Sequence, residues 1–345
     1  MAITYSNAAT QIITNYGLVI GLPPAYPRPF ADMFLQAPLL PGTISETIKW
    51  RYPVDKTKAA QLMKRGGNHG VKKVEDTYFV TVTMQPGIIE AVQALTVGEL
   101  TQLQATGLEE WLISGQRTPT NEMLAADKFM ILKEAILERM NIMASSLINN
   151  GIVAFANGTD QWDFNIPDEI AKTYSSAAGH GIITIVAEAL RDFQKINRKM
   201  PTDFLIGETI ATKMLEDSKV QTSMKNLNYS NVASGLTANE QALIIGQVMG
   251  KELQQMNLSF DENGVQIIGG TKMKLLDRSQ FRRGQGAIPV KNPTTKLPDL
   301  ALMDYYPTVD EGTELDPTAQ LILKNGFFPV VIDPRAIQTY AVTIV

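Results

Sequence analysis

The sequence predicts an α+β fold, and three patterns lead to this expectation. Two stretches near the N-terminus alternate apolar and polar residues, one helical stripe of about 30 residues follows, and helix and strand patterns mix through the remainder. Of the 345 residues, 44% are apolar and 19% are charged, so the chain can bury a substantial core. This length predicts two domains, or one domain with large insertions.

Composition removes several classes of function. The chain has no cysteine, which excludes disulfides, thiolate nucleophiles and cysteine-based metal sites. It has neither a secretory signal pattern nor a run of about 18 apolar residues, so we expect a protein made in the cytoplasm with no membrane segment. A net charge of −4 argues against tight binding to nucleic-acid phosphates.

Residues 1–43 are predicted to form an extended N-terminal arm. Six prolines in the second half of this segment disfavour a regular helix or a central strand. The apolar side chains among these prolines argue against a solvated tail. We therefore expect the arm to pack on its own subunit or on a neighbour, and we assign Phe30, Phe34 and Leu39 to contacts between subunits.

A long β-hairpin is predicted for residues 44–90. Two candidate strands, ETIKWRYPV and DTYFVTVTM, flank the polar stretch LMKRGGNHGVKK, which carries three glycines suited to a turn. A Gly-rich phosphate-binding loop is the competing interpretation of this stretch. That interpretation is weaker because no helix pattern follows to supply the N-terminal amides that bind a phosphate.

A long helix is predicted from about residue 119 to residue 150. Thr118 and Pro119 suit the N-cap and the first helical position, and Asn150 followed by Gly151 suits the end. Apolar side chains recur at three- and four-residue spacing: Phe129, Leu132, Ile136, Met140, Met143 and Leu147. We expect the methionines of this stripe to pack in a core rather than to line a binding groove.

The C-terminal half mixes both kinds of element. Helix patterns cover about 181–199, ETIATKMLED and ANEQALIIGQVM, and strand patterns cover TDFLIG, NGVQIIGG and KMKLLD. The final stretch, from Ala319 onward, is predicted to form two strands around a proline-marked turn.

No pattern points to catalysis. Neither GxxxxGK[ST] nor GxGxxG occurs, and the nearest approaches, IGGTKMK and RRGQG, lack the required spacing. With only His69 and His180, a two-histidine zinc site would require both side chains to converge. The acidic stretch DEGTELD is turn-rich and is predicted to be a solvated loop rather than a cation site. We therefore expect no catalytic residue, no cofactor and no metal.

Charge is distributed unevenly along the chain. Residues 49–73 contain eight basic residues and one acidic residue, whereas residues 299–316 contain acidic residues and no lysine or arginine. Opposite patches on one chain favour head-to-tail association of subunits, because they steer encounter and fix register. The alternative is that both stretches are ordinary solvated faces.

The order of these elements resembles the major capsid proteins of tailed bacteriophages, the Johnson fold, and in particular the phage lambda head-protein family. Three short motifs carry the resemblance in the same order: Arg65-Gly66-Gly67 in the hairpin, Leu297-Pro298-Asp299 before an apolar strand, and the segment Pro329 to Pro334 before the last strand. The agreement in length and element order covers nearly the whole chain.

This resemblance implies a division of the chain and a function. It implies an N-terminal arm (1–43), an E-loop hairpin (44–90), a peripheral domain with a spine helix (91–180), an axial domain (181–316), and C-terminal strands that return to the peripheral domain (317–345). The implied role is a structural subunit that forms hexamers and pentamers of an icosahedral virion shell. The shell would be assembled in the host cytoplasm and would enclose double-stranded DNA without sequence-specific binding. Implied partners are other copies of the chain, a scaffolding protein and a portal; some relatives add a decoration protein, and others join subunits covalently.

Two sets of residues are expected to meet between subunits. The hairpin tip would contribute Lys64, Arg65, Gly66, Gly67, His69, Gly70, Lys72 and Lys73. The acidic counter-surface would contain Asp299, Asp310, Glu311, Glu314 and Asp316. Two alternatives remain open at this point: an encapsulin-like compartment that encloses protein cargo, and an enzyme that binds a phosphate ligand through the hairpin glycines.

Overall fold

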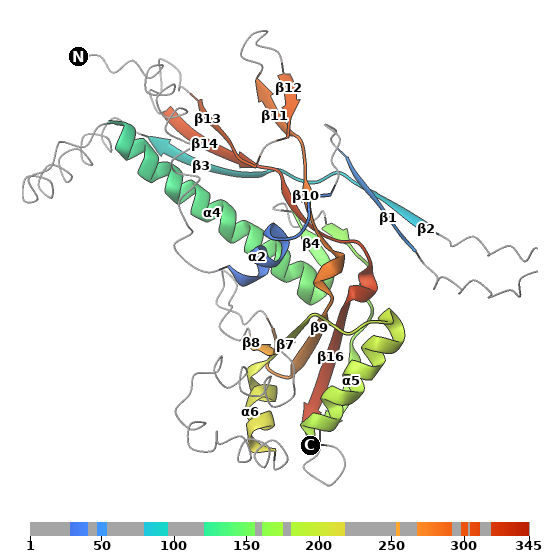
Figure 1. The fold of residues 1–345 in the computed structure, drawn as a ribbon. Coiled ribbons are helices and arrows are strands. Elements are labelled where there is room, and N and C mark those ends of the chain that lie inside the picture. Colours follow the sequence, from blue (N-terminus) through green and yellow to red (C-terminus); the bar gives the residue numbers. More distant parts are fainter. Residues whose placement is uncertain are drawn as a thin grey trace, which may run out of the picture.

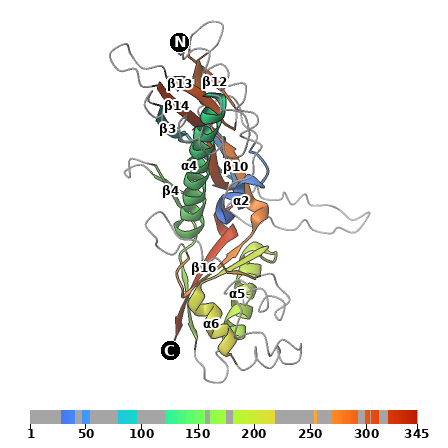
Figure 2. The same cartoon turned by 90° about the vertical axis from the view of Figure 1, so that its left-hand side faces the viewer.

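A computed structural model provides the structure of the chain. It describes residues 28–40, 47–53, 79–95, 121–155, 161–174, 181–217, 253–255, 268–291, 298–302, 304–310 and 319–344. Two hydrophobic cores are present in this part of the chain. The first lies around the long helix α4, and the second lies around a five-stranded sheet with helix α5 (Figures 1 and 2).

Helix α4 (Asn121–Asn150) runs along the whole first core, as the sequence predicts. Every member of the predicted apolar stripe is buried, with exposed fractions between 0% and 8%. The helix ends where Gly151 adopts a φ of +72°, a left-handed conformation that suits glycine at this position. Met140 packs in the core as predicted, whereas Met143 packs in the core and also lines a groove beside the helix, which was not expected.

Two small sheets cover α4. Strands β13 (Tyr306–Asp310), β14 (Ala319–Asn325) and β3 (Ile89–Leu95) form an antiparallel sheet in that order, and β3 lies along the helix. Strands β10 (Phe281–Gln285) and β15 (Phe327–Val331) form an antiparallel pair, and every residue of β15 is buried. Two further pairs are β4 (Ile152–Ala154) with β5 (Gln161–Asp163), and β11 (Ile288–Lys291) with β12 (Pro298–Ala301). Strand β4 contacts α4, whereas β11 and β12 project from the body in Figure 1.

The two strands that flank the predicted hairpin pair as expected. Strand β1 (Ile48–Pro53) is antiparallel to β2 (Phe79–Met84), and the register runs from Ile48 opposite Met84 to Pro53 opposite Phe79. The pair extends away from the body of the molecule in Figure 1. The part of the hairpin beyond these strands lies outside the described residues.

The second core is built on a mixed sheet of five strands. Their order is β6 (Ile170–Tyr174), β16 (Ile337–Ile344), β9 (Lys272–Leu276), β7 (Asp203–Ile206) and β8 (Leu253–Gln255). Helices α5 (Ile182–Asn197) and α6 (Glu208–Glu216) contribute the other apolar side chains of this core. Helix α5 ends at Arg198, which has a φ of +57°, shortly before Pro201. The predicted helices at about 181–199 and in ETIATKMLED and the predicted strands TDFLIG and KMKLLD agree with the structure, whereas the predicted helix ANEQALIIGQVM lies outside the described residues.

Three expectations require correction. Helix α2 (Pro29–Leu35) lies within the arm that was expected to lack helix, because Pro29 occupies the first turn, where the missing N–H is tolerated. The final stretch forms three strands rather than two, since Gly326 separates β14 from β15. Residues 268–270 of the expected strand NGVQIIGG form a bend and a turn. Strands β6 and β16 both belong to the five-stranded sheet, in which β16 pairs with β9 on one side and with β6 on the other.

Candidate assembly surfaces

Strand β1, at the base of the hairpin, has one apolar face that is buried and one basic face that is exposed. Lys49 and Arg51 alternate with Trp50 along β1, so their side chains point to opposite sides of the strand. Trp50 is 7% exposed, whereas Lys49 and Arg51 are both exposed. The residues opposite the two cations on β2 are Thr83 and Thr81, which cannot neutralise them. The described part of the basic stretch therefore presents its charge to solvent.

Aromatic packing fixes this base to the first core. The ring of Trp50 stacks on Phe164 with centroids 6.0 Å apart, and Phe164 stacks on Phe328 at 6.3 Å. Ile48 and Met84 are buried beside this stack, with exposed fractions of 5% and 2%. The hairpin is thus held at its root, and its direction is set by residues that the subunit itself supplies. All eight residues predicted for its tip, from Lys64 to Lys73, lie outside the described residues.

The arm residues predicted to make contacts fall into two groups. Phe30 and Phe34 are completely buried in the first core, and Phe34 stacks on Phe281 with centroids 4.7 Å apart and planes 4° from parallel. Leu39 is 46% exposed and forms an isolated bridge with Arg283. The hydrophobicity of Phe30 and Phe34 is therefore accounted for within the subunit, and Leu39 has a surface that a neighbour could cover.

An ion-pair anchor at the first described residue of the arm was not predicted from the sequence. The Arg28 guanidinium lies 2.5 Å from a Glu134 carboxylate oxygen and 3.2 Å from one of Glu138, and its side chain is 7% exposed. The backbone N–H of Ala31 also donates to Oδ1 of Asn141 at 3.2 Å. A signal was present, because Glu134 and Glu138 lie four residues apart on one face of a helix that was correctly predicted.

The acidic counter-surface is only partly described. Asp299 is exposed on β12, where its Oδ1 accepts a hydrogen bond from the N–H of Leu300 at 2.8 Å. Asp310 is the last residue of β13. The other three predicted members, Glu311, Glu314 and Asp316, lie outside the described residues. The described structure therefore does not test whether the five carboxylates form one surface.

Buried titratable groups lie in the two cores rather than together in a cleft. Lys274 on β9 is fully buried, and its Nζ donates to the carbonyl oxygen of Asn149 at 3.1 Å and to Oγ1 of Thr339 at 2.7 Å. Burial is the main cause that lowers the pKa of Lys274 to about 7, and the nearby charge of Lys272 lowers it further. Burial likewise raises the pKa of Tyr305 to about 12 and raises that of Tyr340.

Few features of the described residues could support catalysis or membrane insertion. Among them, no group of three or more histidine, aspartate or glutamate side chains is arranged to hold a metal ion. No helix in the described ranges combines the length and apolarity needed to cross a membrane. The RRGQG stretch forms strand β10 and the turn after it, and IGGTKMK leads into strand β9, so neither precedes a helix as a phosphate loop does.

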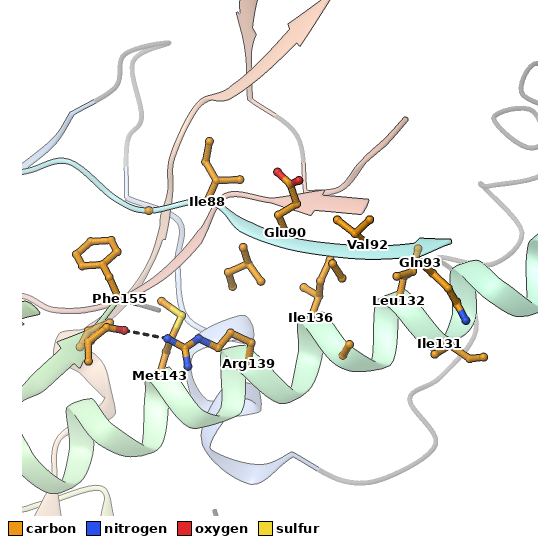
Figure 3. A pocket seen from close by; sticks show the side chains of 16 residues that line it. Ile88, Glu90, Val92, Gln93, Ile131, Leu132, Ile136, Arg139, Met143 and Phe155 are labelled. Carbon is orange, nitrogen blue, oxygen red and sulfur yellow. Dashed lines mark hydrogen bonds between the residues drawn. The ribbon is translucent and has the colours of Figure 1, made fainter. Parts of the chain in front are cut away.

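An apolar groove of about 740 Å³ lies between β3 and α4. Figure 3 shows β3 running above the helix, with Ile131, Leu132 and Ile136 on the helical side and Phe155 near one end. Three side chains around this groove are strongly exposed for their type: Ile88 (41%), Val92 (50%) and Ile131 (57%). No sequence pattern had marked this region, because the groove depends on how β3 and α4 approach one another.

Comparisons with known proteins agree on the fold. No family model matches the sequence, and neither does any curated protein. Solved structures do match. A crystal structure of a protein assigned as the capsid protein of an E. coli CFT073 prophage gives a TM-score of 0.52 at 12% identity, covering 99% of this chain and 100% of that chain.

Two phage capsids match over similar lengths. The capsid protein of the cyanophage P-SCSP1u gives a TM-score of 0.51 at 8% identity, covering 94% of this chain and 91% of that chain. The capsid protein of the Myoviridae phage XM1 gives a TM-score of 0.50 at 12% identity, covering 90% of this chain and 91% of that chain. The predicted fold class is confirmed: this chain has the fold of the major capsid proteins of tailed bacteriophages.

Proposed function

We propose that this protein is the major capsid protein of a tailed bacteriophage, a structural subunit that assembles into the shell of the phage head. One observation carries the proposal: the structural match to the E. coli CFT073 prophage capsid protein extends over 99% of this chain and 100% of that one. A match confined to one domain would support only a shared module. A match from arm to last strand supports a shared role for the whole subunit.

The architecture suits a shell subunit. A hairpin fixed at its root by Trp50 and projecting from the body can reach a neighbouring copy, while the two packed cores keep the subunit rigid. We further propose that the shell is built from hexamers and pentamers and encloses double-stranded DNA. The net charge of −4 supports this role, because a container filled by a motor gains nothing from binding DNA tightly.

The mechanism that we propose for assembly joins opposite charges. The basic tip residues Lys64, Arg65, Lys72 and Lys73 of one subunit contact the acidic surface around Asp310 to Asp316 of the next. Complementary patches raise the rate of encounter and fix the register of the contact. Leu39 adds apolar surface to the interface between subunits.

A charge-swap experiment tests this contact. Replacing the four basic tip residues with glutamate should leave a folded subunit and abolish closed shells, measured by sedimentation and electron microscopy. A matched control, Lys64→Arg with Lys72→Arg and Lys73→Arg, keeps the positive charge and should assemble as the unmodified chain does. Combining the glutamate variant with Asp310, Glu311, Glu314 and Asp316 all changed to lysine should restore shells, because it re-creates the pair with reversed signs.

The outcomes separate the contact from the function. Normal shells from the glutamate variant would overturn the proposed contact but not the proposed role. Loss of assembly in the arginine control as well would show that something other than charge at the tip is required. Shells that copurify with an enzyme cargo, rather than with DNA and a portal, would overturn the proposed role in favour of a cargo compartment.

A further inference from the structure

The groove between β3 and α4 needs an apolar occupant. Val92 on the strand and Ile131 on the helix leave about half of their surfaces exposed, at 50% and 57%. A large apolar surface in an open groove is costly to leave in water. Such grooves are typical sites for another segment of protein.

Few polar groups line this groove. The Glu90 carboxylate is paired within the subunit, 3.2 Å from Nζ of Lys324. Nη2 of Arg139 donates to the carbonyl oxygen of Ala154 at 3.1 Å, which is the dashed line in Figure 3, and the buried Oε1 of Gln93 has no hydrogen-bond partner among the described residues. The rest of the lining is mostly apolar, so the groove favours an apolar segment whose backbone N–H groups can donate to such an acceptor.

Strand β3 also has a free edge. Within the described strands, β3 pairs with β14 on one side and is the last strand of its sheet. An exposed apolar edge strand is a template for another extended segment, because its backbone N–H and C=O groups on that side have no strand partner. Addition of a strand would supply those hydrogen bonds while alternate side chains enter the groove.

The chain itself supplies a segment of the right chemistry at the right place. The first described residue, Arg28, is held on α4 by Glu134 and Glu138, which are helical neighbours of Ile131 and Ala135 in the groove. The 27 residues before Arg28 carry no charged side chain. At roughly 3.3 Å per extended residue, a few of them suffice to cross the face of α4, and the rest can run along β3.

We propose that residues 1–27 of the same chain enter the groove and add an extended strand to the free edge of β3. The apolar run Gly17–Leu22 is the best-suited part of that segment. This inference concerns the isolated subunit and does not depend on the proposed function. The tether through Arg28 favours the subunit's own segment over a second copy, because it gives that segment an effective concentration on the order of millimolar.

Cross-linking in the full-length, unassembled chain tests the placement. Since the chain has no cysteine, Val92→Cys can be paired with Leu18→Cys, Val19→Cys or Ile20→Cys as the only thiols and treated with a short bismaleimide. A matched control pairs the same N-terminal positions with Ile196→Cys, which is 37% exposed on α5 in the second core. Light and heavy isotope-labelled chains are mixed before treatment, and linked peptides are identified by mass spectrometry.

The proposal predicts links within one chain, light to light and heavy to heavy, at about ten times the yield of the Ile196→Cys control. Links between light and heavy chains would overturn it, because the segment would then come from another subunit. Equal yields at positions 92 and 196 would also overturn it, because the segment would then have no preferred location. Val19→Asp with Ile20→Asp should increase the rate at which Val92→Cys reacts with a monofunctional maleimide, and an unchanged rate would contradict the proposal.

Discussion

At the scale of single residues, Lys274 is the most unusual side chain in the structure. It is a fully buried lysine at the place where the last turn of α4 meets the five-stranded sheet, and it links the Asn149 carbonyl to Thr339. A lysine at this position donates to a carbonyl of the last turn of the helix, where carbonyl oxygens have no partner within the helix itself. Because the side chain is buried, the pKa of Lys274 in the folded state falls from the ordinary 10.5 to about 7.

This depressed pKa predicts how stability depends on pH. Between about pH 7 and pH 10.5 the unfolded chain binds more protons at this lysine than the folded chain, so the free energy of unfolding should increase as pH rises through that window. Urea unfolding at about pH 7 and about pH 9.5 measures the increase. Lys274→Met should reduce it, whereas Lys195→Met, a control at a side chain that is 78% exposed, should not. An equal pH dependence in the two variants would contradict this account of Lys274.

Substitutions of the arm residues Phe34 and Leu39 should have different effects, the first on the stability of the subunit and the second on assembly. Phe34→Ala removes a fully buried ring from its stack with Phe281 and should lower the free energy of unfolding by about 3–5 kcal/mol. Leu39→Ala, at a half-exposed position, should cost less than about 1 kcal/mol but should reduce shell assembly. Denaturant unfolding and sedimentation check the two effects. A large stability loss from Leu39→Ala would place its role within the subunit instead.

At the scale of elements, the sequence predicted the helices and strands whose residue pattern lies within a single continuous segment. The stripe on α4, the strands β1 and β2 of the hairpin, and strand β7 all follow from periodicity and turn residues within one segment. Helix α2 was missed because proline content outweighed the helical tolerance of Pro29 at the first turn. The position of β16 could not be predicted, because its partners β6 and β9 are more than 60 residues away and only tertiary packing selects them.

The same reasoning applies to the candidate surfaces. The exposed Lys49 and Arg51 follow from strand alternation, but the burial of Phe30 depends on α4, which is a distant element. The groove beside β3 depends on the approach of two elements whose separate patterns are unremarkable. Surfaces made by one element are therefore visible in the sequence, and surfaces made by two elements are not.

Gly326 lies at the break between β14 and β15, where two stretches of backbone approach each other closely. Its backbone passes so close to Gly286 that an added Cβ would collide with the Gly286 carbonyl oxygen, and the N–H of Gly286 donates to the Gly326 carbonyl at 2.7 Å. Gly326→Ala should lower the free energy of unfolding by about 1–3 kcal/mol. Gly269→Ala is the control, because its Cβ would meet only flexible methylene groups of Lys272 at 3.6 Å. Equal melting temperatures for the two variants would contradict the close approach.

At the scale of the whole molecule, the subunit combines two hydrophobic cores with projecting elements. The first core holds the arm and the root of the hairpin, and the second holds the five-stranded sheet (Figure 2). Identity to the matching capsid proteins is 12% or less, yet each match covers at least nine-tenths of both chains. The order of elements is therefore shared where most individual residues are not.

The proposed role as a shell subunit is tested by electron microscopy of the full-length protein, purified from cells that co-express the genes adjacent to its own. If the chain forms a shell, the images should show closed polyhedral particles of uniform size, built from repeated copies of this chain. Protein that remains monomeric at every concentration and salt condition, with no particles in the lysate, would contradict it.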